Sequence, residues 1–574
     1  MQDTHNPTAT QRAWIFAAAL LMSMSWLISI KAAPWSNLYQ EAWAALSIAL
    51  VLGILLYRSK PAAFQFSWVS ALCLGLLFIP AIQYAFGLIL WWGDAVIQTT
   101  YLAGLLMAIT ATQQLDQRAQ HTLLTAMALS LVLASCASVL FQWFQLSGFR
   151  LEWLRQEIYI TRPSANLSQP NHLGTLLVLG LVSAHFLFRQ AWISRALLLL
   201  ISALLNFGIA LTASRTALLG VVAVVAWHAY AQRRGREDKD PHWTAVLLML
   251  VLAQVFVWLM WQHFPFGAML DHAFNPELLR THSAQRLDAW LMFVHRVIES
   301  PWVGYGMGQV GIAHLIGETH VHPFGALFQS AHNIALDVLL WVGIPLGISI
   351  LGAGTYIVAR ALTMATDGQR LASGAIVAIL NHALLEYPLF YSYFLLTAGV
   401  FIGANSPRFT LRSGQAQLTQ RWLLVPLALL VAAAGKLAWD FKATSELLAR
   451  TDVTQKPSDA ARDAATAHLG VNQHWLKLIQ YSLTDLRSNP HLVDLQELQA
   501  VFFRFPTVHV GLNYAIQLQM RGESQEAQHW LRQTCSVQSP RHCDYLKTQW
   551  IASLNTNASW PTTVFDSAAQ MSPR

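Results

Sequence analysis

Charged residues are scarce in this sequence of 574 residues: only 11% are Asp, Glu, Lys or Arg, whereas 55% are hydrophobic. An ordinary soluble domain contains about 25% charged residues. The composition therefore predicts a polytopic membrane protein with a modest soluble part. The net charge of +7 does not indicate nucleic acid as a partner, because the basic residues lie in short clusters between apolar runs. The positive-inside rule for membrane proteins produces such a distribution.

Several catalytic and ligand-binding motifs are missing as well. The sequence contains no HExxH motif, no Gly-x-Ser-x-Gly elbow and no cysteine spacing typical of zinc or haem. Gly304, Gly306 and Gly308 form a glycine run, but no strand precedes it and no Gly-Lys-Ser/Thr follows, so we expect a flexible external turn and not a nucleotide site. His320 and His322 have a metal-like spacing without further ligands. We therefore expect no metal ion and no cofactor.

Only four cysteines are present. Cys73 and Cys136 lie in apolar segments, whereas Cys535 and Cys543 lie in the polar C-terminal tail. The second pair would form a disulfide if the tail lies in an oxidising compartment.

Apolar windows recur along the first 440 residues. A membrane-spanning helix needs about 20 such residues, and we predict about thirteen spans. The windows lie near 13–31, 41–57, 67–86, 95–112, 122–145, 171–188, 196–213, 217–231, 243–262, 332–357, 371–387, 388–405 and 422–439. We expect the first to be a retained signal-anchor helix, because it is long for a cleaved signal.

Basic clusters on alternate loops predict the orientation of these spans, because such clusters stay in the cytoplasm. They are Arg12, Arg58 and Lys60, Arg118, Arg189 and Arg195, Arg233–Glu237, Arg360 and Arg370, and Arg408, Arg412 and Arg421. The N-terminus is therefore predicted to be inside and, after an odd number of spans, the tail outside. We expect an all-α fold with a membrane domain over 1–440, including an external loop at about 263–331, and an external helical domain over 441–574. A helix pair turning at Arg521–Glu523 resembles a tetratricopeptide unit.

This orientation places one set of polar residues together at the external face. They are Arg162, Gln169, Asn171, Arg215, Arg286, His332, Glu386 and Tyr387. The neighbouring stretches are apolar, and a charge at a helix centre there costs about 2.5–3.5 kcal/mol. Arginines, a histidine and a carboxylate at one membrane face suit an anionic substrate carried by a lipid.

Some of these residues also have simpler interpretations. A neutral His332 imidazole can accept a proton from a hydroxyl, or it is an ordinary interfacial histidine. Arg215, at a turn between two apolar segments, either holds a diphosphate with its guanidinium fork or reaches lipid headgroups. Arg286 lies on an amphipathic stretch with Trp290 one helical turn away.

The remaining candidates have alternatives of the same kind. The polar run that contains Arg162, Gln169 and Asn171 either binds sugar hydroxyls or caps the following helix, for which Asn171 or Ser168 suffices. Glu386 either orients an arginine or a histidine, or is a solvated turn residue.

Several of these segments resemble the O-antigen ligase and polymerase superfamily. The segments are RPSANLSQPNHLGTL at 162–176, Ser214–Thr216, Gln285–Trp290, Glu299–Gln309 and Ala331–Asn333. Three further features resemble the bacterial protein O-oligosaccharyltransferases of the PglL type. These features are APWSNLYQEAWAAL at 33–46, NHALLEYPLFYSYF at 381–394, and the external helical tail.

The resemblance implies a transferase at the periplasmic face of a bacterial inner membrane. Its donor would be an oligosaccharide on undecaprenyl diphosphate, and its acceptor a Ser or Thr hydroxyl of an exported protein such as a pilin. His332 would be the general base, and Arg215 and Arg286 would bind the diphosphate. The pocket for glycan and acceptor would be formed by Arg162, Gln169, Asn171, Glu386 and Tyr387.

Three alternative functions remain open at this point. Ligation of the glycan to lipid A–core, or polymerisation of repeat units, would use similar chemistry with another acceptor. A transporter for lipid-linked glycans is disfavoured, because the polar groups cluster at one face and no broken helix is expected near the bilayer centre. A non-catalytic scaffold leaves the cost of Arg215 unexplained.

Overall fold

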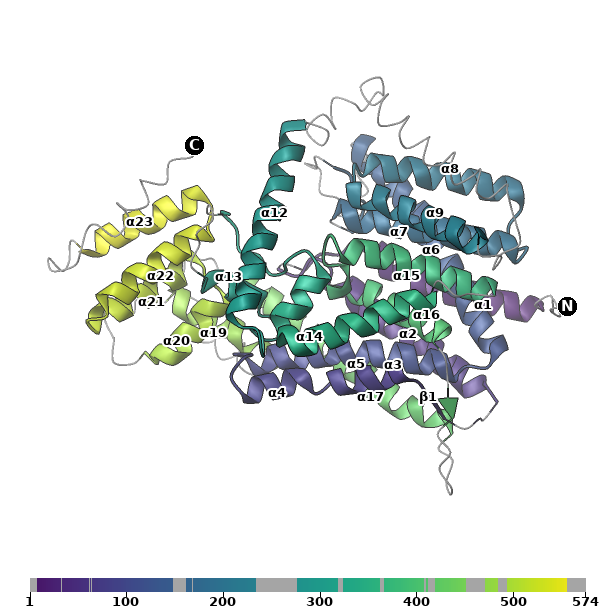
Figure 1. Cartoon of the computed structure of the whole chain (residues 1–574), viewed down its shortest axis with the longest axis horizontal. Helices are drawn as coiled ribbons and strands as arrows, with labels where there is room; N and C mark the ends of the chain where they lie inside the picture. Colours follow the sequence, from purple (N-terminus) through teal and green to yellow (C-terminus); the bar gives the residue numbers. More distant parts are fainter. Residues whose placement is uncertain are drawn as a thin grey trace.

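The computed structural model describes residues 8–32, 34–60, 62, 64–147, 162–167, 169–233, 276–317, 324–361, 366–406, 409–410, 419–450, 470–483 and 493–554. Within these residues the fold is almost entirely helical. A two-stranded antiparallel sheet pairs β1 (Gln65–Phe66) with β2 (Phe409–Thr410). Figure 1 shows a bundle of long helices with a smaller helical unit at one end. The all-α prediction is confirmed.

The helical elements of the bundle, long and short, fall largely within the apolar windows of the sequence. They are α1 (Ala9–Leu27), α2 (Leu38–Arg58), α3 (Trp68–Leu76), α4 (Ile79–Ala85), α5 (Trp92–Gln114), α6 (Gln117–Ser147), α7 (Pro170–Arg189), α8 (Arg195–Leu211), α9 (Arg215–Arg233), α14 (Ile334–Ala361), α15 (Asp367–Ala383), η2 (Pro388–Phe390), α16 (Ser392–Asn405), η3 (Gln420–Leu423) and α17 (Leu424–Arg450). The predicted window at 243–262 lies outside the described residues.

Among the described residues, seven helical stretches are long and apolar enough to cross a membrane, and the shorter apolar helices α8, α9 and α16 accompany them. The chain is thus a multi-pass membrane protein. The total of about thirteen spans, and the side on which each loop lies, stay predictions. So does the division at residue 440, which falls within α17.

Small residues let the helices of the bundle approach one another closely. On α16, Gly399 and Gly403 face α5, where a Cβ at Gly403 would come within 2.5 Å of the Ile109 carbonyl oxygen. Close backbone approach of this kind is the usual means of helix association in membranes. Helix starts are defined by capping residues, as at α15, where Thr366 and Gln369 form a capping box.

Helix α14 is broken near the end that carries His332. Gly343 has a φ of 76°, and Pro345 two residues later supplies no N–H to the helix ladder. The carbonyls released by the break are used elsewhere: the Leu340 oxygen accepts from the Tyr305 N–H at 2.7 Å, and the Trp341 oxygen accepts from the Gln83 amide at 2.7 Å. The break is therefore stabilised by the 301–306 segment and by α4.

The glycine run at 304–308 consequently differs from the flexible turn expected from the sequence. All three glycines have positive φ, and a Cβ at Gly304 would come within 2.4 Å of the Leu340 carbonyl oxygen. The run is a tightly packed turn against broken α14. His320 and His322 lie outside the described residues.

The C-terminal unit has a hydrophobic core of its own. Its elements are η4 (Gly470–Asn472), α19 (Gln473–Leu483), α20 (Leu495–Arg504), α21 (Val508–Met520), α22 (Ser524–Ser536) and α23 (Pro540–Leu554). Phe502, Tyr514 and Trp550 are fully buried at its centre. The predicted turn at Arg521–Glu523 joins α21 to α22, and Gly522 in it has a φ of 87°.

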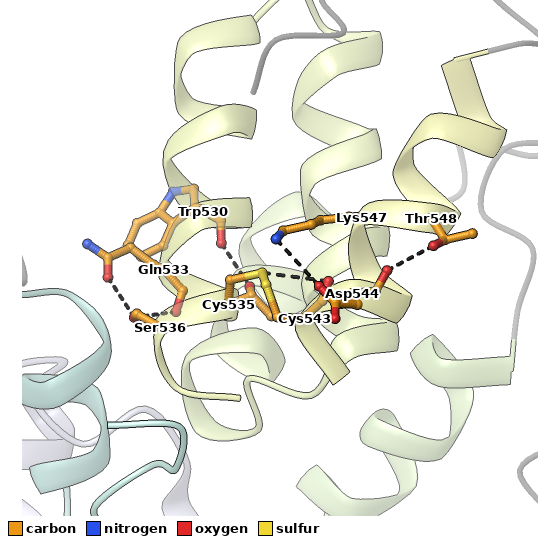
Figure 2. The surroundings of a disulfide bond; sticks show 9 residues. Trp530, Gln533, Cys535, Ser536, Cys543, Asp544, Lys547 and Thr548 are labelled. Carbon is orange, nitrogen blue, oxygen red and sulfur yellow. Dashed lines mark hydrogen bonds and ion pairs between the residues drawn. A yellow bond between two sulfur atoms is a disulfide. The ribbon is translucent and has the colours of Figure 1, made fainter. Parts of the chain in front are cut away.

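Cys535 and Cys543 form a disulfide between the end of α22 and the start of α23 (Figure 2). Figure 2 also shows the nearby ion pair between Lys547 and Asp544. The disulfide closes the short connection between the last two described helices. Cys73 and Cys136 are free.

Two elements of the predicted external loop connect the bundle to this C-terminal unit. They are α12 (Pro276–Glu299), which includes the amphipathic stretch expected from the sequence, and α13 (Val310–Leu315). Val310 and Ala313 of α13 pack with α12 and α14, whereas Leu315 is buried in the core of the C-terminal unit. The Gln533 amide of α22 also donates to the Gly317 carbonyl at 3.1 Å. α13 thus belongs to both cores.

An ion pair fastens the C-terminal unit directly to the bundle. Arg504 of α20 donates to both carboxylate oxygens of Asp94 at the start of α5, at 2.9 and 3.3 Å. The Asp94 side chain is 8% exposed and that of Arg504 is 25% exposed. The bidentate geometry and the burial make this pair stronger than an ordinary surface pair.

We expect Arg504→Ala to loosen the C-terminal unit by leaving a buried carboxylate without its partner. The cost should be about 2 kcal/mol, below the roughly 3–5 kcal/mol of a fully buried pair because Arg504 is partly exposed. Thermal unfolding and limited proteolysis of the purified protein in detergent would measure it. The control is Lys547→Ala, which removes an exposed pair and should cost less than about 1 kcal/mol. Equal effects of the two changes would show that the Asp94 pair does not secure the unit.

Candidate active site

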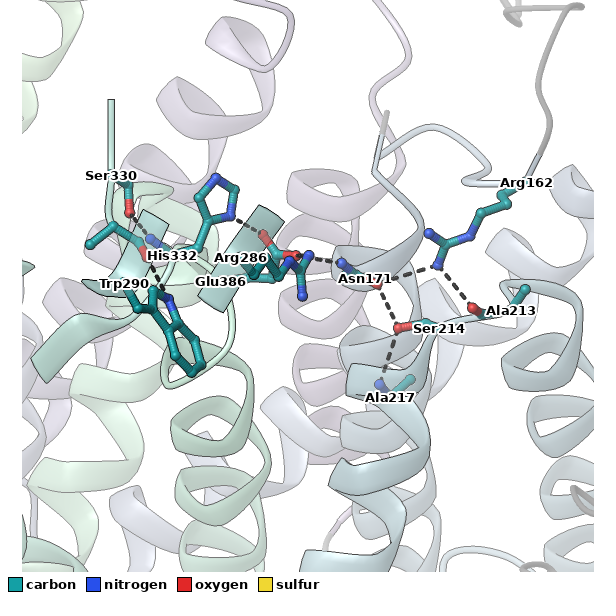
Figure 3. Close-up of polar contacts among 11 residues, drawn as sticks. Arg162, Asn171, Ala213, Ser214, Ala217, Arg286, Trp290, Ser330, His332 and Glu386 are labelled. Carbon is teal, nitrogen blue, oxygen red and sulfur yellow. Dashed lines mark hydrogen bonds and ion pairs between the residues drawn. The ribbon is translucent and has the colours of Figure 1, made fainter. Parts of the chain in front are cut away.

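Glu386 lies at the centre of the candidate site. It follows the last turn of α15, where its backbone N–H donates to the His382 carbonyl at 2.8 Å, and its side chain is only 2% exposed. The carboxylate accepts hydrogen bonds from three parts of the chain (Figure 3). Its Oε1 accepts from the Arg286 guanidinium and from the Asn171 amide, the latter at 2.9 Å. Its Oε2 accepts from His332 Nδ1 at 2.6 Å. Residues 54 to 215 positions away in the sequence therefore meet at one carboxylate.

These contacts also determine the ionisation of Glu386. Burial alone would raise its pKa, but the hydrogen bond from His332 and the charge of Arg286 outweigh burial and lower the pKa below its usual value. Glu386 is consequently a carboxylate at neutral pH. A buried carboxylate is stable only when it is paired and hydrogen-bonded in this way.

His332 has an unusual backbone conformation, with a φ of 54°. A left-handed conformation is uncommon for residues other than glycine and of order 1–3 kcal/mol unfavourable. The surrounding contacts impose it: the His332 N–H donates to Ser330 Oγ at 3.0 Å, and Asp337 accepts from Ser330 Oγ and from the Ala331 N–H, both at 2.7 Å. On the other side, Trp290 Nε1 donates to the Ala331 carbonyl at 2.9 Å.

Asp337 and Ser330 are therefore site residues that sequence reasoning missed. Asp337 is completely buried in the first turn of α14. A signal was present, since a carboxylate inside an otherwise apolar span is costly and calls for an explanation. However, an acidic residue near a helix start is also explained by its favourable interaction with the helix dipole. Asp337 could therefore be taken for an ordinary residue of the first turn.

A second group of contacts extends from Asn171, near the start of α7. The oxygen of its amide accepts from Ser214 Oγ at 2.7 Å and from Arg162 at 3.4 Å (Figure 3). Ser214 Oγ in turn accepts from the Ala217 N–H at 3.1 Å, which places it at the start of α9. Asn171 thus links Glu386 to the turn between α8 and α9 and is not a simple helix cap.

Arg162 stabilises the same turn between α8 and α9. Its guanidinium donates to the Thr212 and Ala213 carbonyls at 3.0 and 3.1 Å. Burial lowers its pKa to about 10, which still leaves it charged at neutral pH. Arg215 begins α9 immediately after this turn, as expected from the sequence, and its side chain is exposed.

Gln169 and Tyr387 complete the predicted set. Gln169 occupies the position before α7 without making a capping hydrogen bond, and its buried amide oxygen has no donor among the described residues. The Tyr387 ring meets the His332 ring edge-on, with 4.8 Å between centroids. Burial, together with the charge of Glu386, raises the pKa of Tyr387. Ser168 lies outside the described residues.

A large apolar cavity of about 590 Å³ opens beside this cluster. Tyr387, whose ring contacts that of His332, lines it. Its walls are formed by α2, α5, α14, α16 and α17, together with Asn472, His474, Trp475 and Arg504 of the C-terminal unit. On α2 it runs from Leu38 to Leu52, a distance of about 20 Å at 1.5 Å per residue. The lining is mainly hydrophobic, but it also includes Glu41, Gln98 and the ion pair of Asp94 with Arg504.

No group of three or more His, Cys, Asp or Glu side chains within the described ranges is placed to hold a metal ion. The expectation of a metal-independent site stays a prediction.

Comparisons with known proteins show which families the chain resembles. Residues 196–351 match the family described as O-antigen ligase, and residues 370–537 match the C-terminal family of virulence-factor membrane-bound polymerases. A general O-oligosaccharyltransferase of Acinetobacter baylyi is 29% identical over 423 residues, which is 70% of this chain and 71% of that protein. A ComP-specific O-oligosaccharyltransferase of the same organism is 26% identical over 253 residues, covering 43% of this chain and 44% of the relative.

The chain belongs to the Wzy_C family of O-oligosaccharyltransferases. The resemblance found in the sequence is thereby confirmed. An oligosaccharyltransferase requires a glycan donor and a protein acceptor. The O-antigen ligase match covers α8, α9, α12 and the segment with His332, whereas the polymerase match begins in α15 and includes Glu386.

The sequence argument against a transporter expected no broken helix near the bilayer centre, and this stays a prediction. α14 of the oligosaccharyltransferase is nevertheless broken at Gly343. The break lies nine residues after the first residue of α14, on the side of the candidate site, and the Gly343–Pro345 pair causes it. Membership of the oligosaccharyltransferase family is now the main argument against a transporter.

We expect Glu386→Gln to lower glycan transfer by this oligosaccharyltransferase by about 10²-fold or more. A neutral amide cannot serve as a charged acceptor for both Arg286 and His332, so the imidazole loses its fixed orientation. Transfer would be measured from the glycosylated fraction of an acceptor protein, at equal membrane levels of the enzyme. The matched control is Glu526→Gln, an exposed glutamate of α22. If Glu386→Gln retained the activity of this control, the carboxylate would not be needed to hold the cluster.

Proposed function

We propose that the protein transfers an oligosaccharide en bloc from undecaprenyl diphosphate to Ser or Thr hydroxyls of exported proteins such as pilins. The observation that carries the proposal is the contact between His332 and the buried Glu386, beside an apolar cavity in a membrane protein. The proposed location is a bacterial inner membrane, with the site and the C-terminal unit in the periplasm. The disulfide between Cys535 and Cys543 is compatible with that oxidising compartment.

In the proposed mechanism, His332 acts as the general base. With Nδ1–H donating to Glu386, the Nε2 lone pair is directed away from the carboxylate and accepts the proton of the acceptor hydroxyl. The hydroxyl oxygen forms a bond to the anomeric carbon of the first sugar while the bond from that carbon to the diphosphate oxygen breaks. The electron pair leaves with the diphosphate. Glu386 stabilises the imidazolium until its proton passes to water.

The arginines would neutralise the charge that develops on the departing diphosphate. Arg286 uses one nitrogen to bind Glu386, and its 43% exposed side chain keeps other N–H donors for a phosphate. Arg215 is exposed at the start of α9, where the N-terminal backbone N–H groups also favour an anion. We assign both to diphosphate binding.

The remaining residues divide between positioning and substrate contact. Glu386, Asn171 and Arg162 already bind several groups of the protein, and we assign them to positioning the base and the turn that precedes Arg215. Tyr387 would contact the substrate where the cavity meets His332. Gln169 would accept a hydrogen bond from a sugar hydroxyl, because its buried amide oxygen finds no donor among the described residues.

The cavity supports a donor carried by a lipid. Its mainly hydrophobic walls would shield a polyprenyl chain, while the diphosphate lies at the end where Tyr387 meets His332. An acceptor protein needs no such channel. A water-soluble nucleotide sugar would leave the cavity without a function.

The first test is intact-mass analysis of a pilin co-expressed with the protein in cells that hold a lipid-linked glycan. We expect a mass increase equal to the glycan, lost with His332→Ala because the general base is removed. Lipopolysaccharide from the same cells is examined in parallel. Unmodified pilin with glycan on lipid A–core would replace protein glycosylation with ligation. Normal pilin modification by the variant would contradict the role of His332.

Arg215→Lys tests the diphosphate assignment. An ammonium ion keeps the charge but cannot make a forked contact with phosphate oxygens, so we expect transfer to fall by about tenfold or more. Initial rates would be measured in membranes with purified lipid-linked donor. Arg195→Lys, at the exposed start of α8, is the matched control and should leave the rate unchanged. Full activity of Arg215→Lys would show that charge alone is sufficient.

A further inference from the structure

Helix α12 has an exposed apolar stripe that the site does not use. Leu287, Leu291, Val294 and Ile298 are 42–63% exposed. At 100° per residue these four positions fall within about 60° of the helix circumference. Trp302, at 76% exposure, extends the apolar surface just beyond the end of the helix. A continuous apolar surface of this kind requires a partner in a soluble environment.

The other sides of α12 are clearly different from this stripe. Ala289, Phe293 and Val297 are buried against α13 and α14. Arg286 falls on this same protein-facing side, between the positions of Phe293 and Val297, and it binds Glu386. A flank next to the stripe carries polar groups, including the exposed His295. α12 thus has a protein-facing side that includes Arg286, a polar flank and an apolar stripe.

The direction of α12 relative to the bundle indicates which environment surrounds its apolar stripe. Figure 1 shows α12 running across the long helices, near the end of the bundle that carries the C-terminal unit. A helix in this position lies along the membrane surface and not through it. Amphipathic helices with this orientation insert their apolar side at the boundary between headgroups and acyl chains.

The apolar stripe is also continuous with a surface that faces lipid. Gly343 in the break of α14 packs directly against the Trp302 backbone. Just after the break, Leu346 and Ile348 of α14 are 40% and 60% exposed on a helix long and apolar enough to span the membrane. The exposed apolar surface therefore continues from α12 through Trp302 to the lipid-facing side of α14. Trp is the residue enriched at such interfaces.

We infer that α12 lies in the outer boundary of the bilayer, with Leu287, Leu291, Val294 and Ile298 in contact with lipid acyl chains. The polar flank with His295 faces water and headgroups, and the protein-facing side holds Arg286 at headgroup depth. The inference requires a multi-pass membrane protein and does not depend on which acceptor is glycosylated.

The experiment places one fluorescent probe on each side of α12. Leu291→Cys and, one turn later, His295→Cys are made separately in a protein whose free cysteines Cys73 and Cys136 are changed to serine. Each is labelled with an environment-sensitive fluorophore and reconstituted into phosphatidylcholine nanodiscs. Glycan transfer by each variant is compared with that of the unlabelled protein to show that the fold is retained. Ile298→Cys is the second stripe position if Leu291→Cys fails this check.

We expect the stripe probe to show blue-shifted emission, to lose intensity with lipids spin-labelled near the headgroup, and to resist aqueous iodide. The His295 probe should show the opposite pattern. Iodide quenching of the stripe probe without lipid quenching would overturn the inference, because the stripe would face water. Resistance to both quenchers would also overturn it, because another segment or another copy of the chain would then cover the stripe.

Discussion

The buried carboxylate of Glu386 is the constraint on which the rest of the site depends. It is nearly inaccessible to solvent and accepts hydrogen bonds from α7, α12 and the segment that precedes α14. An unpaired carboxylate at this position would be strongly unfavourable, so the loss of any of the three partners is expected to destabilise the fold. The arrangement that positions His332 is thus coupled to the stability of the membrane bundle.

Most of these residues could be found from the sequence, because a polar side chain in an apolar segment is energetically costly and therefore indicates a structural or functional role. It could place His332, Arg286 and Glu386 at one membrane face through charge and hydropathy. It could not show that they touch, because the partners are 54 and 100 residues apart and only tertiary packing brings them together. The role of Asp337 was missed for a related reason: it depends on hydrogen bonds from the Ser330 hydroxyl and the Ala331 N–H, which only the folded structure shows.

The fold shows the same division between local and long-range information. The apolar helices of the bundle were predictable from apolar windows, because their composition determines burial in lipid. The break in α14 had a local signal in Gly343 and Pro345, yet its position depends on the contact with the 301–306 segment. The amphipathic part of α12 was also visible, but which of its sides is buried follows from packing against α13 and α14.

The shared use of α13 by two hydrophobic cores has a consequence for how this enzyme class diversifies. Leu315 completes the core of the C-terminal unit, and Leu327, on the way to His332, packs against that same core. The C-terminal unit is therefore not an interchangeable module. Exchange of this unit between relatives would succeed only if residues 310–332 were exchanged with it, so the unit and the segment that leads to His332 are expected to evolve as one inherited block.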